Sequence, residues 1–270
     1  MRIVLLCASM PHQVALANKI ASEFNLAGIV LEKKSVVKAK KLTLKSIAAK
    51  FVYKIAFRQI ANAWSKMLDY YRHRYNQLPD TKVLEVANIN DDTVKNFITA
   101  AKADLVMVSG TSMIRKNILS VPLTIGMINL HTGLSPYIKG APNCTNWCIA
   151  NNQLHLIGNS VMWIDAGIDS GDLLATSIVG FTGKENLAEV HIKVMEEAHA
   201  LYLKAVRTIT YNTAKRVKQS SIANGKTYYS KDWNFAANKR LLKNFKNFEQ
   251  ETTSEAYKQN IKETITIPAE

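Results

Sequence analysis

The chain has 270 residues, of which 47% are hydrophobic and 21% are charged, the balance of an ordinary globular protein. This composition excludes a long disordered protein, and no apolar run approaches the roughly 20 residues that a membrane-spanning helix needs. Three cysteines are few for a disulfide scaffold and their odd number leaves a free thiol, so we expect a cytoplasmic location. The formal net charge of +14 predicts attraction to polyanions or to ligands that carry phosphates or carboxylates.

The first 31 residues predict a β–α–β unit. Residues 2–7 form an apolar run typical of a buried strand, residues 9–24 place apolar side chains at helical spacing, and residues 26–31 return to strand character. This order predicts an open parallel sheet with right-handed crossovers. The turn from Ala8 to His12 lacks the Gly-x-Gly-x-x-Gly pattern, which weighs against a nicotinamide site.

A basic segment at about 33–78 interrupts the alternation, because its lysines are interleaved with apolar residues at the spacing of one or two amphipathic helices. One interpretation is a surface for peripheral membrane or polyanion contact. The other, which we favour, is a solvated helical insertion that covers the edge of the sheet.

The α/β pattern then resumes with strands predicted at 83–86 and 104–109 and a helix at 92–101 capped by Asn90 or Asp91. The next predicted strand, 126–131, carries Asn129 and His131, which are two residues apart and therefore share a face. An unpaired buried amide or imidazole costs about 1–3 kcal/mol, so this pair meets a polar network or lines a site. The turn-rich loop 132–142 follows, where open α/β sheets place their ligands.

Three motifs follow one another along the chain between residues 129 and 172. The run Asn129-Leu-His131, the loop at 134–142 and Asp165-x-Gly-x-Asp169-x-Gly-Asp172 resemble the signature of the formyltetrahydrofolate-dependent formyltransferases. That family includes enzymes that formylate methionyl-tRNA, glycinamide ribonucleotide and sugar nucleotides. The resemblance covers roughly residues 1–180 apart from the basic segment. It implies an α/β, Rossmann-like catalytic domain over residues 1–212, with an open, mostly parallel sheet, flanking helices and the basic insertion, followed by a short C-terminal arm over residues 213–270.

The resemblance also implies roles. Asn129 and protonated His131 would donate hydrogen bonds to the formyl oxygen as negative charge develops on it. Asp169, rather than Asp165 or Asp172, would accept the proton of the attacking amine and keep His131 charged. The co-substrate would be N10-formyltetrahydrofolate, with no metal. Its pterin would contact Ser112, Met113, Ile114, Asp165, Gly167 and Ile168.

Other candidates have plainer interpretations. Cys144 and Cys148 lie four apart on a predicted helix at 143–150, but the chain lacks the thiols for a tetrahedral metal site, and Trp147 indicates packing. His12 lies in the first βα turn, where a ligand contact and an ordinary turn both remain open. His155, His191 and His199 are interpreted as surface or core residues.

We therefore expect a homodimeric N-formyltransferase that acts on a nucleotide-linked amino sugar in the synthesis of surface polysaccharide such as lipopolysaccharide. One alternative is an enzyme like methionyl-tRNA formyltransferase, in which the basic insertion replaces a tRNA-binding domain that the short arm does not supply. A formyltetrahydrofolate hydrolase is another. A non-catalytic, basic polyanion-binding protein on the same scaffold is the fourth, and the presence of Asn129, His131 and Asp169 weighs against it.

Overall fold

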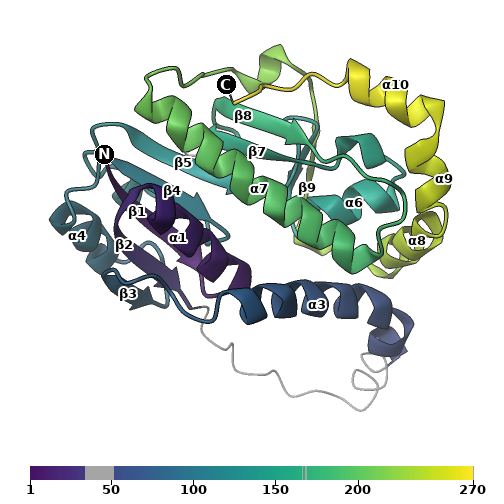
Figure 1. The fold of residues 1–270 in the computed structure, drawn as a ribbon, viewed down its shortest axis with the longest axis horizontal. Helices are drawn as coiled ribbons and strands as arrows, with labels where there is room; N and C mark the ends of the chain where they lie inside the picture. The colour runs from purple at the N-terminus through teal and green to yellow at the C-terminus, as the bar shows by residue number, and fades with distance from the viewer. Residues whose placement is uncertain (34–51, 166, 168, 270) are drawn as a thin grey trace.

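The computed structural model describes residues 1–33, 52–165, 167 and 169–269. Its centre is a seven-stranded sheet with strand order β3-β2-β1-β4-β5-β7-β8 (Figure 1). The five strands from β3 to β5 are parallel, whereas β7 runs antiparallel to both β5 and β8. The prediction of a Rossmann-like, mostly parallel sheet is confirmed. The strands are β1 (Arg2–Ala8), β2 (Asn25–Glu32), β3 (Val83–Val86), β4 (Leu105–Ser109), β5 (Gly126–His131), β7 (Gly158–Trp163) and β8 (Leu173–Ile178).

The central strands are buried on both faces because their side chains are apolar in both directions. Residues 3–7 of β1 are fully buried, and every residue of β4 is buried. Helices α1 (Pro11–Glu23) and α7 (Leu187–Thr210) cover one face, where Leu16 and Tyr202 join the core. Helices α4 (Asp92–Ala100) and α5 (Lys116–Leu119) belong to the core of the other face, which contains Val94 and Ile118. Among the helices in the described ranges, none is long and apolar enough to cross a membrane.

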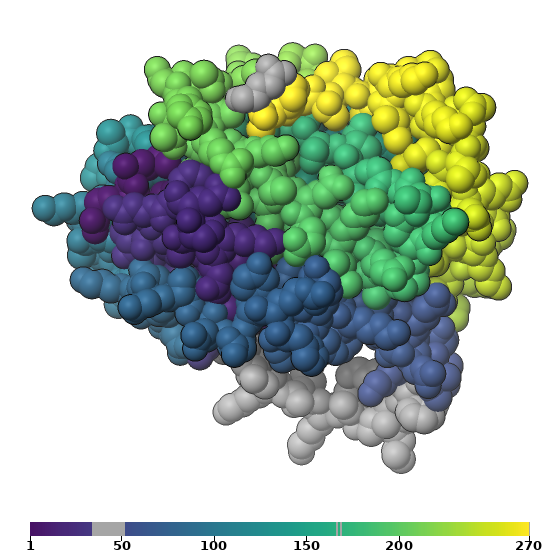
Figure 2. Space-filling view, viewed as in Figure 1, coloured from purple at the N-terminus to yellow at the C-terminus, as the bar shows by residue number. Residues whose placement is uncertain are grey.

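The described part of the basic segment contains helix α3 (Arg58–Arg74). Its buried side chains are Ala63, Met67 and Tyr71, spaced four apart, so they form one stripe along the helix. Met67 and Tyr71 of that stripe pack on Ala15 of α1 and Met195 of α7, and Figure 2 shows α3 lying along both helices. The expectation that the insertion covers the sheet edge is therefore wrong for α3, because its apolar stripe matches helices rather than strand β3. The lysines between 34 and 51 lie outside the described residues.

The C-terminal segment folds back on the middle of the chain. Strand β9 (Lys226–Tyr228) pairs in parallel with β6 (Ile138–Gly140), and helix α8 (Phe235–Phe245) packs on α6 (Cys144–Ala150). Tyr228 stacks on Trp147 with ring centroids 4.3 Å apart. The arm is therefore joined to a second hydrophobic core. The described ranges also contain α9 (Phe248–Thr253), α10 (Glu255–Glu263) and the 3-10 turns η1 (Leu154–Leu156), η2 (Gln219–Ser221) and η3 (Ser230–Asp232).

One tyrosine joins helix α7 to the two strands that lead into the site. The hydroxyl of Tyr202, which is fully buried, accepts a hydrogen bond from the backbone N–H of Val108 at 2.9 Å. It donates to the carbonyl of Ile128 at 2.8 Å. These contacts fix the spacing of β4 and β5 immediately before Asn129.

We predict that Tyr202→Phe lowers the free energy of unfolding by about 1–3 kcal/mol, because it leaves the buried N–H of Val108 without an acceptor. Urea denaturation measures this change. The matched control is Tyr211→Phe, since Tyr211 is 74% exposed at the end of the same helix and its loss should leave stability unchanged. Equal stabilities of the Tyr202→Phe and wild-type proteins would show that the hydroxyl does not hold the strands.

Candidate functional site

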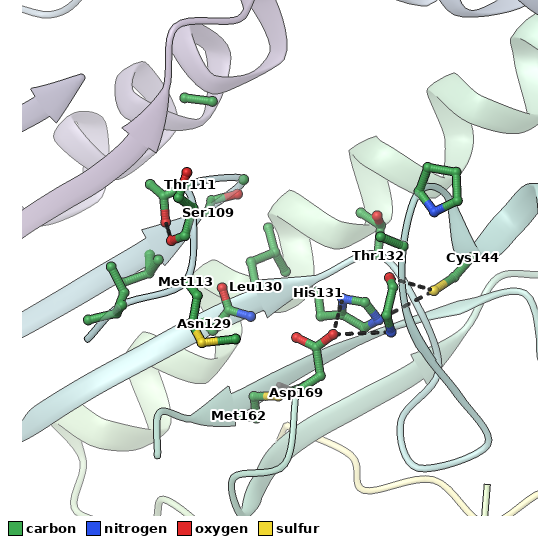
Figure 3. A pocket seen from close by; sticks show the side chains of 18 of the residues that line it. Ser109, Thr111, Met113, Asn129, Leu130, His131, Thr132, Cys144, Met162 and Asp169 are labelled. Carbon is green, nitrogen blue, oxygen red and sulfur yellow. Dashed lines mark hydrogen bonds and ion pairs between the residues drawn. The ribbon is translucent and has the colours of Figure 1, made fainter. Parts of the chain in front are cut away.

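The carboxyl ends of β1, β4 and β5 meet at one edge of the sheet because these strands are parallel. A cavity of about 990 Å³ opens there, and segments that follow all three strands line it. Asn129, His131 and Asp169 all lie in its wall (Figure 3). The fold thus brings together the three side chains that the sequence indicated.

Strand β5 positions two of the three. Asn129 and His131 face the cavity, whereas Ile128, the residue before Asn129, is fully buried in the core of the sheet. The register places Asn129 between Val108 of β4 and Met162 of β7, so the amide is held between paired neighbours. This geometry follows from the two-residue period of a strand.

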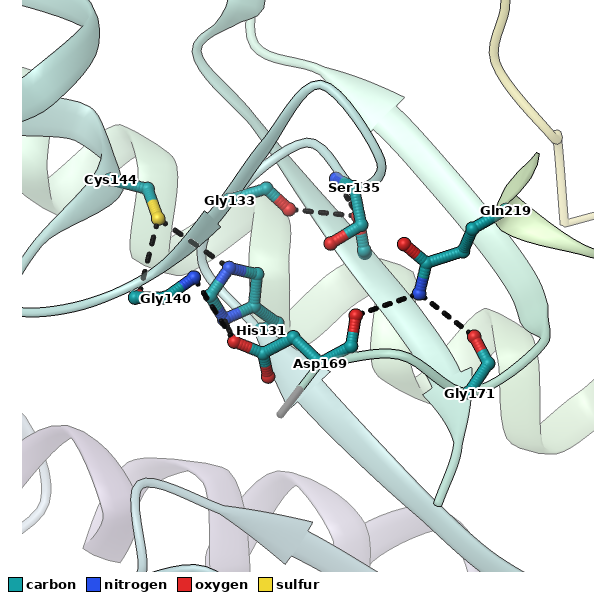
Figure 4. Close-up of polar contacts among 9 residues, drawn as sticks. His131, Gly133, Ser135, Gly140, Cys144, Asp169, Gly171 and Gln219 are labelled. Atoms are coloured by element: carbon teal, nitrogen blue, oxygen red, sulfur yellow. Dashed lines mark hydrogen bonds and ion pairs between the residues drawn. The ribbon is translucent and has the colours of Figure 1, made fainter. Parts of the chain in front are cut away.

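Asp169 arrives on the loop that follows β7 and has a left-handed backbone conformation, with a φ of 46°. Its Oδ2 lies 3.6 Å from Nδ1 of His131 and accepts the backbone N–H of Gly140 at 3.2 Å (Figure 4). The side chains of His131 and Asp169 are only 12% and 16% exposed. Water therefore screens this ion pair weakly.

Gln219 holds the Asp169 loop from the C-terminal segment. Its Nε2 donates to the carbonyl of Asp169 at 2.8 Å and to that of Gly171 at 2.9 Å, and its side chain is buried. Gln219 was not predicted from the sequence. A polar side chain 50 positions from the loop has no local signal, because only the fold brings the two segments together.

Cys144 lies on the opposite side of the imidazole. Its Sγ is 3.5 Å from Nε2 of His131 and 3.5 Å from the carbonyl oxygen of Gly140. The close approach depends on Gly133, since a Cβ there would lie 2.4 Å from Nε2 of His131 and 2.8 Å from Sγ of Cys144. Trp147 packs in the core as expected, but the contact between Cys144 and His131 was missed.

The surroundings of His131 favour its charged form. Burial lowers the pKa of the imidazole, but the neighbouring Cys144 and Asp169 outweigh it and raise that pKa to about 9. His131 is therefore an imidazolium near neutral pH and can donate from both nitrogens.

The residues expected to contact folate lie in the wall of the same cavity, namely Ser112, Met113, Ile114, Asp165 and Gly167. Ile168 lies outside the described residues. The backbone N–H of Ser112 donates to the buried carboxylate of Glu32 at 2.6 Å, which anchors the loop after β4. The carboxylate of Asp165 accepts from the N–H of Gly167 at 2.9 Å and shapes the other loop. Met113 presents a side chain that is 49% exposed.

Of the other histidines considered from the sequence, His12 lines the cavity, whereas His155, His191 and His199 are not among its lining residues. His12 lies in the cavity wall beside Trp64 of α3, and burial lowers its pKa to about 4, so it is neutral near pH 7. His191 and His199 are buried core residues, and His155 lies in η1. Within the described ranges, no three His, Cys, Asp or Glu side chains are placed to hold a metal ion.

The family model described as formyl transferase matches residues 1–206. The chain belongs to the formyl transferase family. The family prediction is thus confirmed, and the match includes all the residues assigned to the candidate site except Gln219.

Among curated sequences, methionyl-tRNA formyltransferase of Clostridium tetani is 30% identical over 140 residues, which are 51% of this chain and 44% of that enzyme. The chain thus spans about half the length of the curated relatives that it matches. Among solved structures, a sugar N-formyltransferase from a Shewanella species is 14% identical, with a TM-score of 0.56 over 90% of this chain and 88% of that one.

An N-formyltransferase from Helicobacter canadensis, solved in complex with folinic acid and dTDP-3-aminofucose, is also 14% identical. Its TM-score is 0.55, over 91% of this chain and 81% of that one. At this identity the likeness shows a shared fold.

We predict that His131 titrates with a midpoint near pH 9 and that Asp169→Asn lowers this midpoint, because the variant keeps the shape but removes a negative charge. NMR of labelled histidine side chains measures the titration. Asp172→Asn is the matched control, since Asp172 lines a separate, smaller cavity and its loss should leave the midpoint in place. A midpoint that does not move in Asp169→Asn would show that the carboxylate does not sustain the imidazolium.

Proposed function

We propose that this member of the formyl transferase family moves a formyl group from N10-formyltetrahydrofolate to the amine of a nucleotide-linked amino sugar. The observation that carries the proposal is the convergence of Asn129, His131 and Asp169 in the wall of one cavity of about 990 Å³. That volume is at the upper end of the range of about 300–1,000 Å³ for small-molecule sites, which suits two substrates meeting in one space.

On this proposal the folate occupies one side of the cavity. Met113 is 49% exposed although its side chain is apolar, and such a side chain in a cavity wall suits the face of a flat ring. Ser112 and Ile114 also line the cavity, and on this proposal the backbone of Asp165 and Gly167 meets the polar edge of the pterin. When bound, the folate supplies an activated formyl group.

The residues of the site have complementary roles in the transfer. Asn129 and the imidazolium of His131 donate hydrogen bonds to the formyl oxygen as the substrate amine attacks the formyl carbon. A bond forms between the amine nitrogen and that carbon, and the bond from the carbon to the folate nitrogen breaks as that nitrogen takes up a proton in place of the formyl group. Asp169 accepts the proton that the amine loses, directly or through water. Holding the two substrates in contact supplies the rest of the rate enhancement.

The acceptor is supported by the structural neighbours. The Shewanella protein is described as a sugar N-formyltransferase, and the Helicobacter canadensis protein was solved with a nucleotide-linked amino sugar. Both share their fold with about nine-tenths of this chain, including much of the C-terminal segment. On this proposal the enzyme acts in the cytoplasm, in a reaction sequence that builds surface polysaccharide such as lipopolysaccharide, as a homodimer.

Methionyl-tRNA is the second candidate acceptor, because the curated relatives are methionyl-tRNA formyltransferases and the chain carries a net charge of +14. The salt dependence of the activity distinguishes the two acceptors. Each phosphate contact with a nucleic acid releases counterions, so activity on tRNA should fall steeply as salt rises, whereas activity on a sugar nucleotide should change little.

The decisive assay incubates the protein with N10-formyltetrahydrofolate and a panel of aminosugar nucleotides, and mass spectrometry detects the gain of one formyl group. Initiator methionyl-tRNA is assayed in parallel. Formylation of the tRNA alone would overturn the sugar acceptor. Release of formate with every acceptor omitted, and no formylated product with any of them, would instead identify a hydrolase.

We predict that Asn129→Ala and His131→Ala each lower kcat by about a hundredfold or more, because each removes a donor to the developing oxyanion. Asp165→Asn should act on folate affinity, since Asp165 shapes the adjacent loop. His73→Ala is the control, because His73 is exposed on α3, and its turnover should match that of the wild type. Near-normal turnover in a folded Asn129→Ala or His131→Ala protein would remove that residue from the mechanism.

A further inference from the structure

Four neighbouring groups in the site form a closed circuit of polar contacts (Figure 4). The N–H of Gly140 donates to Oδ2 of Asp169 at 3.2 Å, and the same Oδ2 lies 3.6 Å from Nδ1 of His131. Nε2 of His131 is 3.5 Å from Sγ of Cys144, which is itself 3.5 Å from the carbonyl oxygen of Gly140. Gly140 thus contacts the carboxylate through its N–H and the thiol through its carbonyl.

The positions of the protons follow from chemistry. A carbonyl oxygen only accepts, so the contact between Cys144 and Gly140 requires the thiol to donate its proton there. The lone pairs of the sulfur then remain for Nε2–H of His131. The titratable groups that face the two ring nitrogens are Asp169, from the loop after β7, and Cys144, from α6, and the backbone of Ile138 also forms a hydrogen bond with the ring. Both nitrogens consequently carry protons, which is the form that an oxyanion needs as its donor.

We propose that Cys144 is a positioning residue, which holds the Nε2 proton of His131 toward the cavity until the formyl oxygen replaces the sulfur as its acceptor. This inference rests on the proposed function. A thiol sulfur is a weak acceptor, so it can orient the donor and yet lose it easily to an oxygen on which negative charge develops. A carboxylate in the same place would compete with that oxygen, and a methyl group would give the Nε2 proton no acceptor.

The geometry of the site supports a role beyond packing. Cys144 lies in the cavity wall, although it is only 3% exposed. Cys148, one turn later on α6, is 1% exposed and is not among the residues that line the cavity. The two cysteines therefore offer a matched pair, alike in chemistry and burial and different in their contact with His131.

The test compares Cys144→Ala, Cys144→Ser and Cys148→Ala by steady-state kinetics, pH profile and NMR titration of His131. We expect Cys144→Ala to lower kcat by about tenfold or more with the KM for folate nearly unchanged, because a donor that is no longer oriented acts on the transition state more than on binding. The midpoint of the His131 titration should also fall. Cys144→Ser should recover most of the turnover, since a hydroxyl can both donate to Gly140 and accept from His131.

Cys148→Ala should lower the melting temperature but leave the pH profile and the His131 midpoint unchanged, because it removes only packing. The proposal is overturned if Cys144→Ala keeps the kcat and the His131 midpoint of the wild type, or if Cys144→Ser is no better than Cys144→Ala. If Cys144→Ala does not fold, the serine variant decides, and a fall to background turnover with a lowered His131 midpoint in that variant contradicts the proposal.

The titration uses no substrate, so it tests the circuit even if the protein formylates none of the acceptors. A wild-type midpoint in Cys144→Ala would overturn the inference and leave the proposed function intact. An absence of formyl transfer by the wild type, with a midpoint that falls in Cys144→Ala, would overturn the function and leave the circuit in place.

Discussion

The ion pair between His131 and Asp169 is the contact on which the arrangement of the site depends. Two largely buried charges are stable only when further hydrogen bonds satisfy them, and the fold supplies these from several directions. Gly140 donates to the carboxylate, Cys144 meets the far side of the imidazole, and Gln219 holds the backbone of the Asp169 loop. The charge of His131 therefore depends on these neighbours as much as on its position in strand β5.

The same contacts explain why the C-terminal segment belongs to the site although it contributes none of the three proposed catalytic side chains. Strand β9 pairs with β6, which ends at Gly140, and the stacking of Tyr228 on Trp147 fixes α6, which carries Cys144. Gly140 has a φ of +90°, and a Cβ there would lie 2.1 Å from the carbonyl oxygen of Tyr228. The second core thus sets the positions of both groups that flank the imidazole.

Helix α3 has a comparable relation to the other side of the cavity. Its Met67 and Tyr71 seat it on α1 and α7, and this packing brings Trp64 to the cavity wall beside His12. The neutral imidazole of His12 and the cationic imidazole of His131 therefore line one cavity. Burial without a charged partner accounts for the first, and burial beside Asp169 and Cys144 accounts for the second.

The sequence by itself predicted the five parallel strands and the helices α1, α4 and α6, and it indicated the three residues of the candidate site, because these depend on local periodicity and on motifs that lie within short stretches of chain. Strand β5 was predicted with the bounds that the structure has, and the two-residue period placed Asn129 and His131 on one face. Family resemblance, and not the pattern of residues, selected Asp169 among three nearby acids.

Only the tertiary structure decided the strands β6, β8 and β9, the packing of α3 on helices, and the places of Gln219 and Cys144 beside the ion pair. Three-residue strands carry too little periodicity to be recognised, and the contacts of Gln219 join positions about 50 residues apart. Packing beside Trp147 was a sufficient reason for a cysteine at position 144. Its contact with His131 could be found only in the structure, because that contact depends on how α6 packs against β5. Interactions of this kind are properties of the folded chain, since neither partner shows a preference for the other in its own segment.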